Sequence, residues 1–219
     1  MDQLSSLREA ILTGDAASAA GATREALAAG VTPVDVIADG ISPAMAEVGR
    51  LFEEGEYFVP ELLIAARATK EVFAILRPLL VAAGAEPAGR VLLATVEGDL
   101  HDIGKNLVGA MLEGAGFEVV DLGVDIPAAR FVSAVRESRP QIVGLSALLT
   151  TTMPAMKTTL EALDAAGLRS EVKIMVGGAP VTQKYADSIG ADGYGETATA
   201  AVDVARRLID ARNVAESRG

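Results

Sequence analysis

The chain contains one histidine, His101, and no cysteine. The absence of cysteine excludes disulfides, iron–sulfur clusters and thiolate zinc sites, and a single imidazole cannot form a multi-histidine metal cage. It cannot form a pair of histidines acting as acid and base either. Any metal binding or catalysis that uses imidazole must therefore use His101, which lies in the segment Glu97-Gly98-Asp99-Leu100-His101-Asp102-Ile103-Gly104-Lys105.

A carboxylate stands close to this histidine, because Asp99 precedes it by two residues. At that spacing the carboxylate can accept a hydrogen bond from one ring nitrogen, which fixes the tautomer and leaves the other nitrogen free to bind a metal. Gly98 and Gly104 allow the backbone to turn tightly beside a bulky ligand. The alternative interpretations are a solvated loop histidine and an Asp102 that only caps a helix. The segment lacks the spacing of a P-loop or a dinucleotide-binding fingerprint.

Two further segments offer groups for a ligand. The first runs from Ser146 to Met153 and holds four hydroxyl side chains in seven residues, which can donate hydrogen bonds to a polar ligand and accept them from it. The second is Gly177-Gly178-Ala179-Pro180, where paired glycines leave room for a flat group against the backbone. Helix capping by Thr151 and Thr152, and an ordinary turn at the glycines, are the alternative interpretations.

Short apolar runs alternate with helical patterns after residue 89, which is typical of a parallel sheet covered on both faces. We expect a five-stranded α/β domain with the flavodoxin-like strand order 2-1-3-4-5. In such a sheet ligands bind beyond the carboxyl ends of the strands, beside the first strand, and His101 falls there. The strands are expected at 91–96, 117–122, 142–146, 172–176 and 192–194, and the helices at 105–113, 127–137, 156–166, 181–188 and 197–211.

The N-terminal part has a helical pattern throughout. Helices are expected at 4–12, 16–29, 32–53 and 60–80, with Thr32 as an N-cap and Pro33 at the first helical position. Four helices with short turns predict a small bundle. We therefore expect a helical bundle cap domain over 1–85, an Ala-, Gly- and Pro-containing linker over 84–89, and the α/β domain over 90–219.

Composition and charge limit the classes of protein further. The 219 residues are half hydrophobic and carry a net charge of −11, which disfavours nucleic acid as a partner because phosphate binding needs clustered Lys and Arg. The N-terminus lacks the apolar run of a signal peptide, and no stretch has the length of a membrane span. We expect a cytoplasmic protein with no membrane partner.

The motifs together resemble those of a known family. Asp99-Leu100-His101-Asp102-Ile103-Gly104 resembles the Asp-x-His-x-x-Gly motif of cobalamin-binding proteins, with Ser146-Ala147-Leu148 as their Ser-x-Leu and Gly177-Gly178 as their Gly-Gly. Met45-Ala46-Glu47-Val48-Gly49 and Phe58-Val59-Pro60-Glu61-Leu62 resemble the helical cap of methionine synthase and of the corrinoid proteins that serve methylamine, methanol, betaine or aryl methyl ether methyltransferases. Each motif is weakly specific alone, but they occur in order and cover nearly the whole chain.

The resemblance implies a role for individual residues. His101 would ligate cobalt in place of the cofactor's dimethylbenzimidazole, Asp99 would hydrogen-bond His101, and Thr152 would complete the relay. Phe58, Ala65 and Ala68 would shield the methyl group, although Thr69 stands where many relatives have Met. Cofactor contacts are implied for Gly98, Asp102, Ile103, Gly104 and Thr150, for Ser146, Leu148, Gly177 and Gly178 around the nucleotide tail, and for Ala198 with Tyr194 and Glu196 near its end.

The resemblance also implies a function. The protein would carry a methyl group on cobalt, alternating between methylcobalamin and the Co(I) corrinoid, from a substrate-specific methyltransferase to an acceptor methyltransferase. It would be a component of a methyltransferase system rather than a stand-alone enzyme, with a reductive activase as a further partner. The bundle would act as a movable lid, with a hinge near Pro87.

Three other functions stay open from the sequence. A cobalamin-dependent light or ligand sensor could share both domains and act through a protein partner. The small subunit of an adenosylcobalamin mutase generally lacks the helical cap, and a plain flavodoxin-like module would leave the three motifs as coincidence. The methyl donor cannot be read from the sequence, because the partner enzyme selects it.

Overall fold

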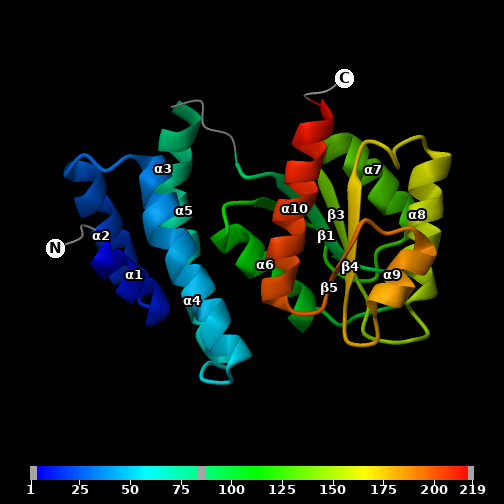
Figure 1. Ribbon diagram of the computed structural model, residues 1–219, viewed down its shortest axis with the longest axis horizontal. Coiled ribbons are helices and arrows are strands. Elements are labelled where there is room, and N and C mark those ends of the chain that lie inside the picture. Colours follow the sequence, from blue (N-terminus) through cyan, green and yellow to red (C-terminus); the bar gives the residue numbers. More distant parts are fainter. Residues whose placement is uncertain (1–3, 83–86, 217–219) are drawn as a thin grey trace. The chain divides into compact units, whose positions relative to one another are not determined.

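The computed structural model describes residues 4–82 and 87–216 and contains helices and a parallel sheet (Figure 1). The chain divides into two compact units, Met1–Pro87 with Ala110–Gly116, and Ala88–Gly109 with Phe117–Gly219. Residues 84–86 of the expected linker lie outside the described residues, so the predicted domain boundaries stay predictions. No helix in the described ranges has the length and apolarity needed to cross a bilayer.

The first unit has the expected helical pattern. Asp15 accepts hydrogen bonds from the backbone N–H groups of Ala17 and Ser18, and Thr32 accepts one from Asp35, so both side chains act as N-caps. Apolar side chains at helical spacing are buried, among them Leu7, Ile11, Met45, Val48, Leu62 and Val72. The helical elements are α1 (Ser5–Leu12), α2 (Ala16–Ala28), α3 (Pro33–Asp35), η1 (Val36–Ile41), α4 (Ser42–Glu53) and α5 (Val59–Ala82).

The third expected helix contains an irregularity that its sequence pattern did not predict. Between α3 and α4 the chain forms η1, a π-helical segment of six residues. Within it, a Cβ atom on Gly40 would lie 2.9 Å from Leu7 Cδ2, so this glycine allows η1 to pack closely on α1. Helical spacing alone does not distinguish a π-helical segment from an α-helix, because both bury apolar residues along one face.

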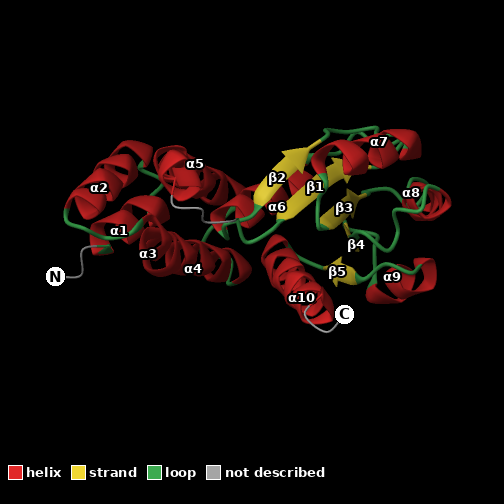
Figure 2. Ribbon diagram, turned by 90° about the horizontal axis from the view of Figure 1, so that it is seen from above, coloured by secondary structure: helices red, strands yellow, loops and turns green. Residues whose placement is uncertain are grey.

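The second unit confirms the predicted α/β class and strand order. All adjacent strands are parallel, in the order β2-β1-β3-β4-β5. In Figures 1 and 2, α6 and α10 lie on one face of the sheet and α7, α8 and α9 on the other. The elements are β1 (Arg90–Thr95), α6 (Ile103–Gly114), β2 (Glu118–Asp121), α7 (Ala128–Ser138), β3 (Ile142–Ser146), α8 (Pro154–Ala165), β4 (Lys173–Gly177), α9 (Gln183–Ile189), β5 (Gly193–Gly195) and α10 (Ala198–Glu216).

The register of the strands brings the candidate segments to one edge of this sheet. Thr95 pairs with Ser146, Ser146 with Gly177, and Gly177 with Gly195. These four residues end β1, β3, β4 and β5, so the loops that follow them start side by side. Segments about 50 and 80 residues from His101 in sequence therefore lie at the same edge.

Candidate functional site

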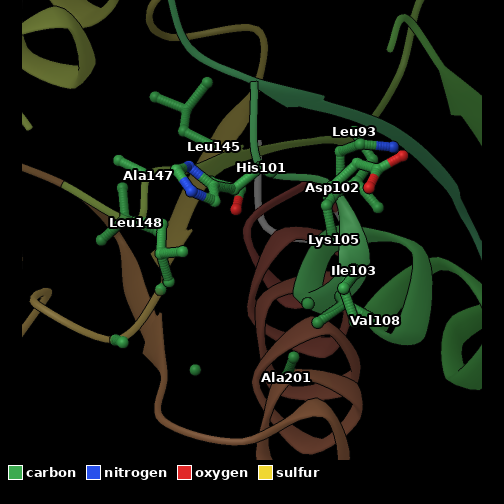
Figure 3. A pocket seen from close by; sticks show the side chains of 18 of the residues that line it. Leu93, His101, Asp102, Ile103, Lys105, Val108, Leu145, Ala147, Leu148 and Ala201 are labelled. Carbon is green, nitrogen blue, oxygen red and sulfur yellow. The ribbon is translucent and has the colours of Figure 1, made fainter. Parts of the chain in front are cut away.

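A cavity of about 580 Å³ opens beside His101, within the α/β unit. Its lining comes from the β1–α6 loop, the ends of β3, β4 and β5, and the facing sides of α6 and α10. In the view of Figure 3, the His101 imidazole lies toward Ala147 and Leu148, with Ile103 and Val108 of α6 on the other side and Ala201 of α10 below. The volume is in the range of sites that hold a cofactor or substrate.

Glycines shape this cavity, because backbone or side-chain atoms of neighbouring strands and loops approach them more closely than a Cβ atom allows. A Cβ on Gly177 would lie 2.9 Å from the carbonyl oxygen of Gly195, and one on Gly144 would lie 2.8 Å from Leu93 Cδ1. At Gly178 the added Cβ would lie only 1.9 Å from the carbonyl oxygen of Ala147. The Gly-Gly pair therefore has a structural reason beyond turn formation: it lets the β4–α9 turn pack against the β3–α8 loop.

Asp99 is fully buried and connects the loop that carries His101 with the β3–α8 loop. Its Oδ1 accepts hydrogen bonds from the backbone N–H of His101 at 3.0 Å and from the ring Nδ1 of His101 at 2.7 Å. Its Oδ2 accepts from the backbone N–H of Leu148 and from the hydroxyl of Thr152, both at 2.7 Å. Both carboxylate oxygens are thus fully engaged as acceptors.

These hydrogen bonds keep Asp99 ionised. Burial raises the pKa of the Asp99 carboxyl, but the hydrogen bonds from Thr152, from the backbone of His101 and Leu148 and from the His101 ring together outweigh it. The pKa is therefore held well below its usual range. An ionised carboxylate can only accept, so the His101–Asp99 bond requires the proton to be on Nδ1.

The other ring nitrogen of His101 is consequently the one that is available. With Nδ1 protonated, Nε2 carries the lone pair, and no hydrogen bond joins it to another of the described residues. The His101 side chain is 51% exposed, at the mouth of the cavity. This is the arrangement in which an imidazole acts as a metal ligand, with the second nitrogen fixed by a carboxylate.

Two other networks hold the same loop. The hydroxyl of Thr95, at the end of β1, donates to the carbonyl of His101 at 2.9 Å. The buried Lys105 pairs with Asp121 and donates to Asn106, whose amide donates in turn to Asp102 at 3.0 Å. Asp102 therefore pairs with a side chain one turn later in α6. Thr152 does not cap α8, because its hydroxyl donates to Asp99 and the N-cap residue of α8, Met153, forms no side-chain hydrogen bond.

The structure brings most of the predicted site residues together. His101, Asp102, Ile103, Gly104, Ser146, Leu148, Gly177 and Gly178 line the cavity, with Glu196. Asp99 and Thr152 lie behind His101, and Gly98 is in the turn that leads to it, with a φ of 81°.

Other predicted residues lie outside the cavity lining. Thr150 is exposed on the β3–α8 loop, and Ala198 is buried in the first turn of α10, next to the lining residue Thr197. Their cofactor contacts stay predictions.

The predicted residues of the helical unit have contrasting exposures. Phe58 is 65% exposed, whereas Ala65 and Ala68 are fully buried. Thr69, which follows Ala68, is also buried, and its hydroxyl has no hydrogen-bond partner among the described residues. The shielding role expected of Phe58, Ala65 and Ala68 stays a prediction.

Several residues that line the cavity were not predicted from the sequence. Leu93, Gly144 and Met175 lie on β1, β3 and β4 and line the cavity with Val108 and Ala201. One signal was available, because Gly144 interrupts an otherwise apolar strand, and a glycine inside a strand often marks the close approach of a ligand or of another chain segment. The alternation of strand residues indicates a shared face, but not which face leaves a cavity.

The hydrogen bond from Thr152 to Asp99 can be tested separately. We expect Thr152→Val to lower the free energy of unfolding by about 2 kcal/mol, the usual contribution of a hydrogen bond to a charged group. The variant should also unfold at a higher pH on acidification, because the hydrogen bond from Thr152 lowers the pKa of Asp99 in the folded wild type and its loss raises that pKa. Urea and acid titrations of the cofactor-free protein measure both. Thr150→Val, on the exposed part of the same loop, is the matched control and should change neither.

Comparisons with known proteins assign the chain to a family. Residues 3–77 and residues 89–203 each match a family described as a B12 binding domain. Trimethylamine corrinoid protein 1 of Methanosarcina acetivorans is 47% identical over 204 residues, which cover 92% of this chain and 94% of the relative. A corrinoid protein of Desulfitobacterium hafniense is 42% identical over 212 residues, covering 95% and 98% of the two chains.

Solved structures agree with this relationship. A chain of the methanol:cobalamin methyltransferase complex from Methanosarcina barkeri superimposes with a TM-score of 0.83 at 33% identity, covering 95% of this chain and 80% of that one. A cobalamin-binding protein from Desulfitobacterium hafniense gives a TM-score of 0.77 at 35% identity, covering 94% and 98%.

The geometry of the site fits the cofactor that these relatives bind. A corrin ring already supplies four nitrogen ligands to cobalt, so the protein needs to provide only one, and His101 Nε2 is available at the cavity mouth. The glycine-shaped cavity beside it has room for a flat heterocyclic group. The chain therefore belongs to the corrinoid proteins of methyltransferase systems, a family of B12-binding proteins, and its cofactor is cobalamin.

Proposed function

We propose that this protein carries a methyl group on the cobalt of cobalamin between two methyltransferases, with His101 as the lower cobalt ligand in place of dimethylbenzimidazole. Bound cobalamin supplies a cobalt centre that accepts a methyl group and gives it up again. The observation that carries the proposal is the His101–Asp99 pair, in which a 2.7 Å hydrogen bond at Nδ1 leaves Nε2 available at the mouth of the cavity.

The protein's own groups have distinct tasks in this function. Asp99 fixes the tautomer of His101 and orients its ring, and Thr152 and the Leu148 N–H keep Asp99 ionised. Ser146, Gly177 and Gly178 line the cavity that would take the displaced nucleotide tail, excluding water from it.

The proposed partners follow from the relatives. A substrate-specific methyltransferase would deliver the methyl group, a second methyltransferase would accept it, and a reductive activase would restore inactive cofactor. Relatives are named for trimethylamine and dimethylamine, and a structural relative belongs to a methanol complex. Family membership therefore leaves the substrate open, and the donor enzyme would select it. The expected cytoplasmic location is part of this proposal.

The variant His101→Ala tests the proposal. We expect it to retain some cobalamin but to lose the absorbance spectrum of histidine-ligated cofactor, because no other imidazole exists in the chain. The rate of methyl transfer from this variant, loaded with methylcobalamin, to an acceptor thiol should also be lower than that of the wild type.

Glu97→Gln, an exposed carboxylate on the same loop, is the matched control and should behave like the wild type. Unchanged spectra and unchanged methyl transfer in His101→Ala would refute the ligand role. Light-driven bleaching of an adenosylcobalamin-loaded wild type, with a change of assembly, would identify a sensor in place of a carrier.

A further inference from the structure

Asp125, on the loop between β2 and α7, has a backbone conformation that residues other than glycine rarely adopt. Its φ is 55°, and among the described residues the only other non-glycine residue with a positive φ is Arg139, at 48°. Such a conformation costs energy in any residue with a Cβ atom, although less in aspartate than in most, and it persists when the surrounding structure requires it. The contacts of Asp125 indicate what that requirement is.

Both hydrogen bonds that Asp125 forms with other described residues are with the loop that carries His101. Its Oδ1 accepts a hydrogen bond from the backbone N–H of Gly98 at 2.7 Å. Its own backbone N–H donates to the carbonyl of Asp99 at 3.0 Å. One residue therefore holds two consecutive residues of the loop, once with its side chain and once with its backbone.

The segment that Asp125 holds is a tight turn directly after β1. Gly98 has a φ of 81°, and the N–H of Asp99 returns to the carbonyl of Val96 at 3.1 Å. The neighbour of Asp125, Ile126, forms an isolated parallel bridge with Val96. The β2–α7 loop therefore holds the turn at Val96, Gly98 and Asp99.

Asp99 is consequently held from two directions. The β3–α8 loop holds its carboxylate, and Asp125 holds its main-chain carbonyl. The hydrogen bond between Asp99 Oδ1 and His101 Nδ1 depends on both, since movement of the turn displaces the carboxylate relative to the ring. Metal ligation by a histidine depends in turn on the orientation that such a carboxylate gives it.

We propose that Asp125 is a positioning residue, which clamps the Gly98–Asp99 turn and thereby fixes the orientation in which His101 meets cobalt. The inference rests on the proposed function, in which His101 is the lower ligand. Asp125 acts through Asp99 and His101.

The test compares three variants after reconstitution with cobalamin. Asp125→Gly removes the carboxylate and relieves the strained φ. Asp125→Asn is the conservative variant, since it keeps a hydrogen-bond acceptor and tolerates the left-handed conformation. Arg139→Gly is the control for strain, because it relieves a positive φ at the end of α7. Cobalamin affinity is measured by spectrophotometric titration. Histidine ligation is measured by electron paramagnetic resonance of the Co(II) form in protein labelled with ¹⁵N-histidine, where His101 is the only labelled residue.

We expect Asp125→Gly to bind cobalamin about tenfold more weakly, by analogy with other residues that orient metal ligands. A smaller fraction of its bound cofactor than in the wild type should show the ¹⁵N splitting in the electron paramagnetic resonance spectrum. The thermal unfolding midpoint of the cofactor-free variant should stay close to that of the wild type, because relief of the positive φ offsets part of the loss of the exposed hydrogen bond to Gly98. Asp125→Asn should lie close to the wild type, and Arg139→Gly should show unchanged affinity and splitting.

Full retention of cobalamin affinity and ¹⁵N splitting in Asp125→Gly overturns the positioning role of Asp125 but leaves the proposed function unaffected. An equal loss in Arg139→Gly overturns it too, because the effect would then not depend on the clamp. Absence of ¹⁵N splitting from the wild type overturns the proposed function, and this inference with it. Should Asp125→Gly fail to fold, Asp125→Ala removes the same hydrogen bond, and the outcomes for cobalamin affinity and ¹⁵N splitting apply to it; the outcome for the unfolding midpoint does not, because alanine keeps the strain of the positive φ.

Discussion

The substitution Asp99→Asn is expected to lower the free energy of unfolding of the cofactor-free protein by about 3 kcal/mol at neutral pH. Each oxygen of the buried carboxylate accepts hydrogen bonds, Oδ1 from His101 and Oδ2 from Leu148 and Thr152. An asparagine amide would direct its NH₂ group at one of these two sets of donors, whichever way it is turned. Buried donors would then face each other without an acceptor.

The size of this effect should depend on pH, because the carboxylate is held ionised. Burial raises the pKa of Asp99, but the hydrogen bonds from Thr152, His101 and Leu148 outweigh it, and the pKa in the folded protein lies below that of an unfolded aspartate, which is about 4. A carboxyl with a lowered folded pKa stabilises the folded protein above the unfolded pKa, and this stabilisation is lost as the pH falls through the folded pKa. The difference between wild type and variant should therefore be greatest near neutral pH and decrease below about pH 4.

Urea unfolding at a series of pH values measures this difference. Asp102→Asn is the matched control, because this exposed carboxylate lies in the same loop and its partner is Asn106. It should change the free energy of unfolding by less than about 0.5 kcal/mol at every pH. A destabilisation by Asp99→Asn that stays constant as the pH falls would contradict the role of the ionised carboxylate.

The substitution Gly178→Ala is expected to destabilise the protein by about 4 kcal/mol or more, at the upper end of single-residue effects. The added Cβ would lie 1.9 Å from the carbonyl oxygen of Ala147. The φ of Gly178 is 126°, a value that residues other than glycine rarely adopt. The clash is with backbone, so no side-chain rotation relieves it. The β4–α9 turn would have to move away from β3, which would also open the cavity wall and weaken cobalamin binding.

Gly167→Ala separates the clash from the conformational strain. Gly167 also has a positive φ, at 73°, but an added Cβ would have no atom within 4 Å. This variant should lose about 1 kcal/mol from the strain alone and bind cobalamin like the wild type. Chemical denaturation and cobalamin titration measure both quantities. Equal destabilisation by Gly178→Ala and Gly167→Ala would show that the Ala147 carbonyl moves away at little cost.

The Ser146–Met153 segment shows how far the sequence could be used to predict the site. Its position at the carboxyl edge followed from strand order, because the loops after parallel strands start at the same edge of a sheet. The partner of each hydroxyl did not follow, because capping of the next helix used the same residues equally well. The structure directs Thr152 to Asp99, 53 residues earlier in the chain.

The amino-acid sequence is sufficient to identify the single imidazole, the carboxylate two residues before it, and the alternation of strands and helices that places both at a ligand-binding edge. These are properties of residue type and of local spacing. The folded structure was needed to show which donors keep Asp99 ionised, how Asp125 reaches the His101 loop, and that the cavity lies between the sheet and α6 and α10. Such features depend on contacts between segments distant in sequence, and local periodicity carries no information about them.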